Sequence, residues 1–92
     1  MKNKTKHIAD LFKSIGHPVR INIIKIIDEH ETLSVGEIQN YLKISQPVIS
    51  LHLGILRKNK IISSVKRGKN HFYIIDNKSI SQAMHIVYYD TN

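Results

Sequence analysis

The sequence predicts a mostly α-helical fold in which four helices precede a small β-hairpin and a fifth helix follows it. Apolar residues recur at helical spacing in five stretches. Two short runs rich in β-branched and aromatic residues flank a basic, glycine-containing turn. A chain of 92 residues is short enough for one domain, so we expect residues 1–92 to form a single unit.

The first two helices are separated by a strong stop signal. The apolar face of the first, over about residues 5–15, consists of Ile8, Leu11, Phe12 and Ile15. Gly16 favours a helix end, and Pro18 suits the first turn of a new helix. The second helix, over about residues 18–29, begins with strand-like alternation. Its apolar pattern then continues through Ile26 and Ile27, which favours a buried helix.

Two further helices are joined by a tight turn near residues 41–45. Ser34 and Glu37 have the spacing of a capping box, and the helix they start continues to about residue 42. Ser45 is expected to cap the next helix, over about residues 45–58, with Pro47 in its first turn. Its buried stripe is Ile49, Leu53 and Leu56. This pair of helices is a helix-turn-helix candidate.

A hairpin over about residues 61–75 and a final helix complete the prediction. The strands are 61–65 and 71–75, and Gly68 supplies a positive φ in the tip between them. The last helix, over about residues 77–89, is expected to bury Ile80, Ala83, Met84 and Val87. A hairpin directly after a helix-turn-helix gives the order of a winged helix-turn-helix domain.

The positive charge is concentrated in one segment. The net charge is +7, yet no Asp or Glu occurs between Ile38 and Ile75. That segment holds seven basic residues: Lys43, Arg57, Lys58, Lys60, Lys66, Arg67 and Lys69. The other seven basic residues equal the seven acidic ones, so the flanks are neutral. A polyanion is the natural partner of such a surface, whereas a merely solvated basic face is the simpler alternative.

The helix over residues 45–58 is expected to enter the major groove of double-stranded DNA. Its face opposite the buried stripe carries Pro47, Ser50, Leu51, Gly54 and Lys58, with Gln46 at the flank. Ser and Gln can contact base edges or phosphates, and a helix N-terminus favours a phosphate. Leu51 leaves two interpretations open: contact with a thymine methyl group, or a leucine that packs on the preceding helix or is simply exposed.

The hairpin tip is expected to reach flanking phosphates or an adjacent minor groove, although a solvated turn is the alternative. With the helix, it completes the predicted DNA-binding set. That set is Ser45, Gln46, Pro47, Ser50, Leu51, His52, Lys58, Lys66, Arg67, Lys69 and Asn70.

These segments resemble the ArsR family of bacterial and archaeal winged-helix repressors. Residues 45–58 resemble the family's recognition helix, and residues 61–73 resemble its strand, wing and strand. Residues 14–21 and 33–38 are similar to the starts of its second and third helices. The resemblance implies a homodimer joined through the first and last helices. The interface residues would be Ile8, Leu11, Phe12, Ile80, Met84, Val87 and Tyr88.

The sequence also departs from the family pattern. Leu51 stands where His or Arg is usual, and Lys43 stands where a turn glycine is usual, so a lysine would adopt positive φ. The chain has no cysteine, which removes the family's cysteine metal site. Its last helix also lacks the family's set of histidines. No pair of the six histidines has i, i+4 spacing, so we expect packing, capping or surface roles and no metal or cofactor. A site shared between subunits is the alternative.

We therefore expect a cytoplasmic, dimeric transcription regulator that binds an inverted-repeat operator as a repressor, with no membrane association and no identified effector. The alternative is a winged-helix protein-interaction module that binds an acidic partner. An enzyme is not expected, because no nucleophile elbow, phosphate loop or HExxH motif occurs.

Overall fold

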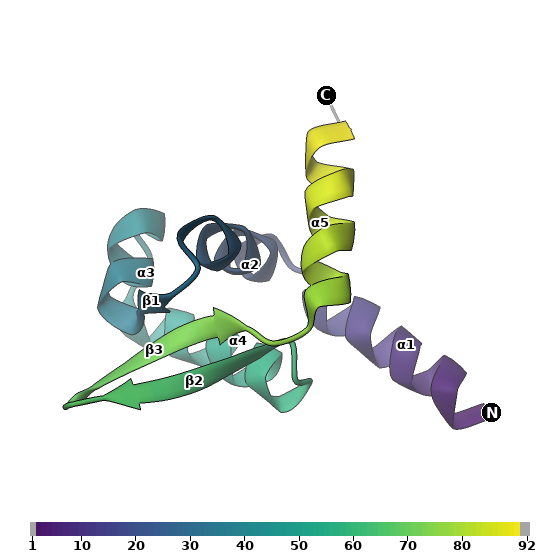
Figure 1. Cartoon of the computed structure of the whole chain (residues 1–92), viewed down its shortest axis with the longest axis horizontal. Coiled ribbons are helices and arrows are strands. Elements are labelled where there is room, and N and C mark those ends of the chain that lie inside the picture. The colour runs from purple at the N-terminus through teal and green to yellow at the C-terminus, as the bar shows by residue number, and fades with distance from the viewer. Residues whose placement is uncertain (1, 91–92) are drawn as a thin grey trace.

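The computed structural model describes residues 2–90, which form five helices and a three-stranded antiparallel sheet (Figure 1). The elements are α1 (Lys2–Ile15), α2 (Pro18–His30), β1 (Leu33–Ser34), α3 (Val35–Leu42), α4 (Gln46–Lys58), β2 (Ile62–Arg67), β3 (Asn70–Ile75) and α5 (Lys78–Asp90). The predicted helical fold with a hairpin is confirmed. Met1, Thr91 and Asn92, the ends of the predicted domain, lie outside the described residues.

The second helix forms despite its many β-branched residues. His17 occupies the N-cap and accepts a hydrogen bond at Nδ1 from the backbone N–H of Val19 at 3.1 Å, and Pro18 starts the helix. Ile23, Ile24 and Ile27 are then completely or almost completely buried. Burial of an isoleucine stabilises the fold by about 2 kcal/mol, whereas its weak helix propensity costs only about 0.5 kcal/mol. Tertiary packing therefore decides in favour of the helix.

A short strand between α2 and α3 was not predicted, so the predicted element order is corrected here. β1 pairs antiparallel with β3, with Leu33 opposite Tyr73 and Ser34 opposite Phe72. The sheet order is β1-β3-β2. A strand of two residues is too short to show an alternating pattern, and its pairing depends on residues about 40 positions away. Only the tertiary fold brings these segments together.

The helix-turn-helix begins at a complete capping box. The backbone N–H of Glu37 donates to Oγ of Ser34 at 3.2 Å, and the backbone N–H of Ser34 donates to Oε1 of Glu37 at 2.8 Å. Lys43 ends α3 in the left-handed region, with φ 57°, and donates its N–H to the carbonyl of Gln39 at 2.8 Å. The expectation of a positive φ at this lysine is confirmed.

The hairpin is longer and tighter than predicted. β2 and β3 pair from Ile62 opposite Ile75 to Arg67 opposite Asn70, which leaves Gly68 and Lys69 as the connection. Gly68 has φ 61°, as the turn requires. The strands therefore include most of the residues that were predicted as a loose tip, and the basic side chains project from a paired ribbon.

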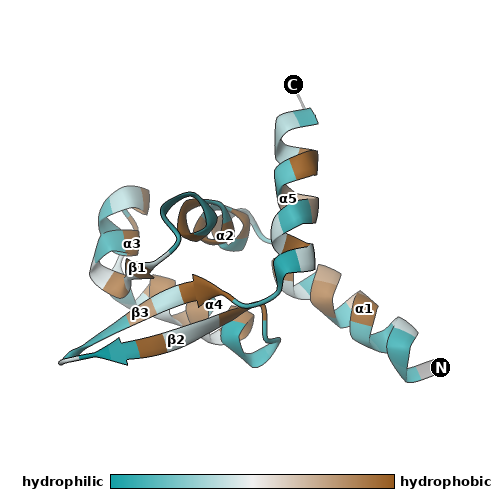
Figure 2. Ribbon diagram, viewed as in Figure 1, coloured by the Kyte–Doolittle hydropathy of each residue, from teal (hydrophilic) through white to brown (hydrophobic). Residues whose placement is uncertain are grey.

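The core lies where α2, α3, α4 and the sheet meet, and hydrophobic stretches of these elements are coloured brown in Figure 2. It consists of Ile15, Ile23, Ile24, Ile27, Leu33, Ile38, Ile49, Leu53, Leu56, Ile61, Ile62, Ile75 and Ile80. The last helix contributes only its first turns, because α5 extends away from this body (Figure 1). Ile80 is buried, but Ala83 and Val87 are exposed, so the prediction that α5 buries them is wrong for the single chain.

Two leucines of α4 provide a matched test of this packing. Leu53 is 2% exposed and Leu51 is 63% exposed. We expect Leu53→Ala to lower the free energy of unfolding by about 3 kcal/mol, because it leaves a cavity. Leu51→Ala should change it by less than about 0.5 kcal/mol. Urea denaturation followed by circular dichroism measures both, and equal losses would contradict the assigned orientation of α4.

Candidate nucleic-acid interface

The recognition helix α4 has one buried and one open face. Ile49, Leu53 and Leu56 are buried as predicted. The residues expected on the opposite face are all exposed: Pro47, Ser50, Leu51, Gly54 and Lys58. Leu51 does not pack on the preceding helix, which removes one of its alternatives. Addition of a Cβ at Gly54 would meet nothing within 4 Å, so the helix surface there is open to a partner.

The N-terminus of α4 is exposed, and the side chain at its N-cap makes no capping hydrogen bond. Ser45 occupies the N-cap position with φ −62° and ψ 151°, but its side chain makes no capping hydrogen bond. The predicted position is therefore right and the predicted bond is absent. Ser45 and Gln46 are both exposed. The first N–H groups of a helix lack intrahelical acceptors, which makes this end suited to an anionic oxygen.

His52 is a predicted contact residue that the structure places in the interior. Its side chain is 7% exposed and lies on the buried stripe of α4, three residues after Ile49. Nδ1 of His52 lies 3.2 Å from Nη1 of Arg20 in α2. Helical periodicity places residues 49 and 52 on the same face, so His52 lies on the internal side of α4 and not on its exposed side.

The wing presents its basic residues to solvent. Lys66, Arg67, Lys69 and Asn70 are exposed, as predicted. The guanidinium carbon of Arg67 lies 5.9 Å from the centre of the Phe72 ring, so the strand beneath supports that side chain. The tight connection at Gly68 holds these residues on a ribbon, which gives the cations a defined place relative to α4.

A hollow joins the recognition helix to the wing and to the start of α3. Its lining residues are Ser34, Val35, Gly36, Gln46, Ser50, Lys69, Asn70, His71 and Tyr73. The fold thus brings Gln46 and Ser50 of α4 to the same depression as Lys69 and Asn70 of the wing, about 20 positions later in the chain. Sequence patterns predicted both groups separately and did not predict their meeting at β1 and α3.

Sequence reasoning missed the surface of the turn between the helices. A second polar depression is lined by Gly36, Gln39, Asn40, Lys43, Ile44 and Ser45. Lys43 is exposed and lies directly before the recognition helix. The signal that could have identified Lys43 is its position in the acid-free segment. Lys43 is therefore an exposed cation beside the start of α4 that the predicted residue set lacked.

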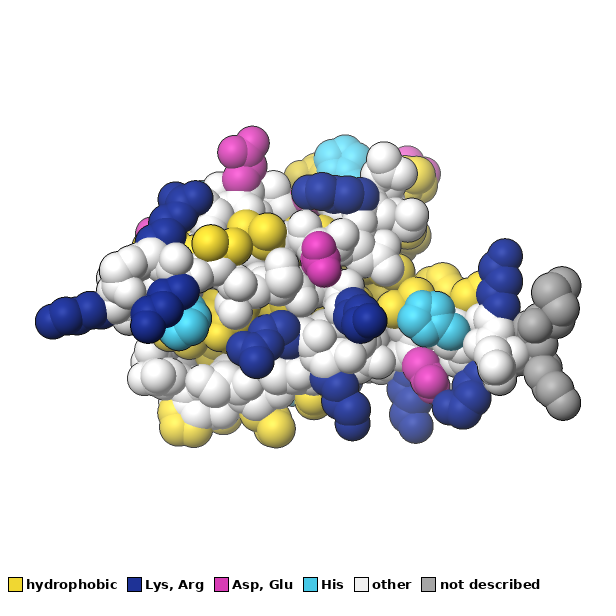
Figure 3. All heavy atoms as spheres, turned by 60° about the horizontal axis from the view of Figure 1, so that its bottom comes forward, with side chains coloured by type: hydrophobic (Ala, Val, Ile, Leu, Met, Phe, Trp, Pro, Cys, Tyr) yellow, Lys and Arg dark blue, Asp and Glu magenta, His cyan; other side chains and the backbone are white. Residues whose placement is uncertain are grey.

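The cations of this surface are not neutralised internally. The salt bridges within residues 2–90 are Lys6–Asp10 and Lys25–Glu29, and both lie outside the acid-free segment. The seven basic residues of the segment are exposed, and Figure 3 shows lysine and arginine side chains extending from the wing across this face. Unpaired cations on an open surface retain their full attraction for phosphates.

Exposed apolar side chains also lie on α1 and on α5, and both helices extend from the same end of the molecule (Figure 1). Phe12 is 64% exposed, Ile86 59% and Val87 62%. Ile8 is also exposed, and Leu11 is half-buried. Ile86 was not among the predicted interface residues, although its helical spacing from Ala83 places it on the open face of α5.

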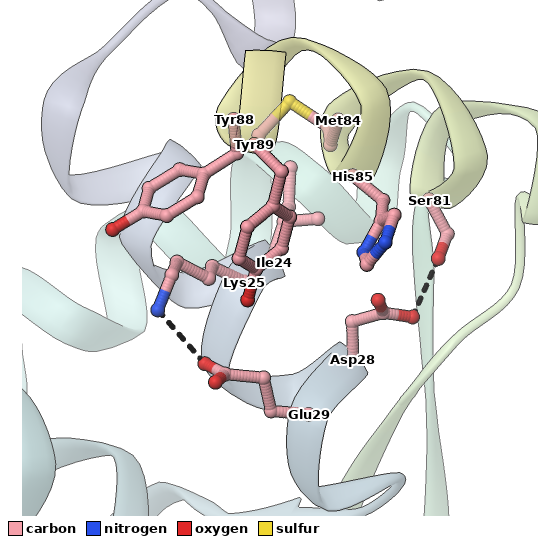
Figure 4. Close-up of a pocket in the computed structure, with 9 residues that line it drawn as sticks. All are labelled: Ile24, Lys25, Asp28, Glu29, Ser81, Met84, His85, Tyr88 and Tyr89. Atoms are coloured by element: carbon pink, nitrogen blue, oxygen red, sulfur yellow. Dashed lines mark hydrogen bonds and ion pairs between the residues drawn. The ribbon is translucent and has the colours of Figure 1, made fainter. Parts of the chain in front are cut away.

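Three predicted interface residues of α5 have other surroundings. Ile80 is in the core, and Met84 and Tyr88 line a small cavity against α2 (Figure 4). Lys25 of α2 pairs with Glu29 at 3.0 Å, and its ammonium lies 4.7 Å from the centre of the Tyr88 ring. The hydroxyl of Ser81 donates to Asp28. The contacts of Lys25 with Tyr88 and of Ser81 with Asp28 fasten α5 to α2. Ile80 and Met84 therefore face inward, whereas Tyr88 lines the cavity and stays 47% exposed.

None of the helices within residues 2–90 combines the length and the hydrophobicity that spanning a lipid bilayer requires. No group of three or more His, Asp or Glu side chains within residues 2–90 is arranged to hold a metal ion.

The fold and this surface define a winged helix-turn-helix protein, and comparison with known proteins identifies the family. Residues 17–64 match the bacterial regulatory protein arsR family. An uncharacterized HTH-type transcriptional regulator of Methanocaldococcus jannaschii is 40% identical over 76 residues, which cover 82% of this chain and 85% of that protein. The biofilm growth-associated repressor of Xylella fastidiosa is 32% identical over 88 residues, 96% of this chain and 76% of that protein. The chain belongs to the arsR family.

Solved structures agree with this assignment. The transcriptional repressor PagR of Bacillus anthracis has a TM-score of 0.88 at 25% identity, covering 95% of this chain and 99% of that one. The repressor BigR of Xylella fastidiosa also has a TM-score of 0.88, at 29% identity, covering 100% and 93%. The protein is a DNA-binding transcription regulator and not an enzyme.

Lys43, which has a positive φ, gives a prediction that separates the effect of backbone strain on stability from the effect of charge on DNA affinity. Lys43→Gly removes both the positive charge and the cost of a left-handed side-chain residue, whereas Lys43→Ala removes only the charge. We expect the glycine variant to exceed the alanine variant by about 1 kcal/mol in free energy of unfolding. Both should lose a similar factor in DNA affinity. Equal stability in urea denaturation would contradict strain at this position.

Proposed function

We propose that this regulator binds an inverted-repeat operator as a homodimer and represses transcription by occupying the promoter. The observation that carries the proposal is the open, unneutralised cationic surface formed by the turn at Lys43, the N-terminus of α4 and the wing. In this arrangement α4 enters the major groove. The wing then contacts phosphates or the adjacent minor groove.

The proposed roles of the individual residues follow from their exposure. Gln46 and Ser50 would contact base edges or phosphates, and exposed Leu51 would meet a thymine methyl group. Ser45 and Lys43 would meet phosphates at the start of the helix, and Lys58 would do so at its end. The remaining phosphate contacts would come from the wing residues Lys66, Arg67, Lys69 and Asn70.

The proposed dimer uses the apolar surface of α1 and α5. Ile8, Leu11, Phe12, Ile86 and Val87 would be covered by the same surface of a second copy, as two-fold symmetry requires. A 92-residue chain has a small core, so this burial would add stability. Two DNA-reading heads would then lie about one helical turn, roughly 34 Å, apart on the duplex.

Repression is proposed because the names of several relatives state it. The Xylella fastidiosa relative and PagR are named as repressors. A bound dimer would block access of the polymerase to the promoter, and such a protein would act in the cytoplasm. The competing function is a protein-interaction module that binds an acidic partner through the same cations. Salt dependence separates the two, because phosphate contacts release condensed counterions.

DNA binding is tested with duplexes selected by the purified protein from a randomised pool. Arg67→Ala should weaken binding to all duplexes by a similar factor and reduce the slope of log affinity against log salt by about 1. Gln46→Ala should instead change the order of preference among duplexes. Lys78→Ala, which removes a charge outside the acid-free segment, is the control. Mobility-shift titrations at two salt concentrations measure these effects.

The DNA assignment would be wrong if wild-type affinity did not depend on salt, or if neither Arg67→Ala nor Gln46→Ala altered binding. In the first case the protein-interaction alternative would be favoured, because a duplex loses condensed ions when its phosphates are contacted.

The dimer is tested by placing a charge in the apolar surface. The chain has a mass of 10.6 kDa, so we expect wild-type protein to sediment with twice that mass. A variant with Phe12→Glu and Ile86→Glu should sediment as the monomer, since an unpaired carboxylate is costly in an apolar interface. Leu51→Glu is the matched control, because Leu51 is equally exposed but lies on α4. A monomeric wild type would refute the proposed assembly.

A further inference from the structure

A cluster of two histidines and an arginine connects the recognition helix to the start of α2. His52 of α4 is almost completely buried, and its Nδ1 lies 3.2 Å from Nη1 of Arg20 in α2. The ring of His17, directly before α2, lies 4.5 Å from the ring of His52, measured between centroids. None of the three residues belongs to the surface proposed to face DNA. They lie beneath it, where α4 meets the rest of the domain.

The hydrogen bonds show which nitrogen of each ring is unprotonated. A guanidinium can only donate, so Nδ1 of His52 accepts from Arg20. Nδ1 of His17 accepts from the backbone N–H of Val19 and thereby caps α2. A protonated imidazole has an N–H at both nitrogens and cannot accept a hydrogen bond. Both contacts therefore require neutral rings that carry their proton on Nε2.

No negative charge offsets the arginine in this cluster. Neither Arg20 nor the two histidines form a salt bridge within residues 2–90, and the buried Nε of Arg20 has no hydrogen-bond partner. Desolvation, followed by the charges of His17 and Arg20, lowers the pKa of His52 from its ordinary value of 6.5. Protonation of His52 would remove its acceptor at Nδ1 and place a second positive charge beside Arg20.

The other charged groups near α4 do not change this balance. The elements that pack on α4 carry exposed charges. These are Lys4, Lys6, Asp10 and Lys13 on α1, Glu37 on α3, and Lys66 and Arg67 on β2, and Asp10 pairs with Lys6. The remaining charges of α2 lie further along that helix, where Lys25, Asp28 and Glu29 line the cavity against α5. No carboxylate is therefore placed to stabilise a protonated His52.

We propose that Arg20 and His17 are positioning residues for DNA binding, which hold α4 in its reading orientation through His52 only while both imidazoles are neutral. Mild acid then loosens α4 and weakens DNA binding. This inference rests on the DNA-binding surface proposed above. The direction of the change in DNA affinity on acidification distinguishes this proposal from a simple charge effect. Protonation of surface histidines adds positive charge and by itself strengthens binding to a polyanion.

The sign of the linkage follows from the lowered pKa of His52. The unfolded chain, with its ordinary histidine, binds a proton more readily than the folded chain does. The contribution of the ordered cluster is therefore complete above about pH 6.5 and is lost as the pH falls below that value. A fall in pH likewise favours any state in which α4 is released and His52 becomes solvated.

The experiment measures affinity for a selected duplex at about pH 7.5 and about pH 5.5, at constant ionic strength. His52→Asn retains an acceptor oxygen near the position of Nδ1 but does not titrate, and His17→Asn retains a capping oxygen. We expect wild type to lose about 10-fold in affinity at the lower pH, and the double variant to lose less than about twofold. His7→Asn, exposed on α1 and outside the surface proposed to face DNA, is the control and should lose as much as wild type.

Wild-type affinity that stays constant or rises on acidification would overturn the proposal, as would a double variant with the wild-type pH profile. Nitrogen-15 chemical shifts of the wild-type rings provide a readout that needs neither DNA nor a folded variant. We expect an unprotonated Nδ1 in both rings near neutral pH, and a proton on Nδ1 of His52 there would refute the cluster. Failure to bind any duplex, with the rings as expected, would instead refute the proposed function and with it the positioning role.

Discussion

The burial of one stripe of α4 against the core is the constraint on which the rest of the molecule depends. Once Ile49, Leu53 and Leu56 are removed from water, the opposite face of the same helix must point outward. That opposite face carries the small and polar residues suited to a groove. Hydrophobic burial, which is not directional, thereby produces a directional surface for recognition.

The sheet fixes the second half of this surface. Pairing of β1 with β3 ties the start of α3 to the base of the wing, so that helix and hairpin cannot move independently without breaking the ladder. Ser34 of β1 and the first residues of α3 line the same hollow as Gln46 and Lys69. The strand of two residues thus has a structural importance greater than its length suggests.

α5 and α4 are both attached to α2, but by different kinds of contact. α5 is fastened to α2 by the ammonium of Lys25 over the Tyr88 ring and by a serine–aspartate hydrogen bond, both near the solvent. The recognition helix is fastened to α2 by isoleucine packing and by a histidine–arginine contact without a counter-charge. Solvent-exposed charged contacts contribute little to stability, whereas a buried polar contact is costly once one partner is lost. We therefore place proton sensitivity at α4 rather than at α5.

The sequence by itself determined the helices, the hairpin, the acid-free basic segment and the open face of α4. These features depend on local spacing and on residue chemistry, such as the capping box at Ser34 and the glycine at the hairpin turn. Only the tertiary structure decided that His52 is internal, that β1 pairs with β3, and that Met84 and Tyr88 face α2 while Ile86 faces outward. The reason is physical: periodicity shows which residues share a face, but burial depends on which partner segment covers that face.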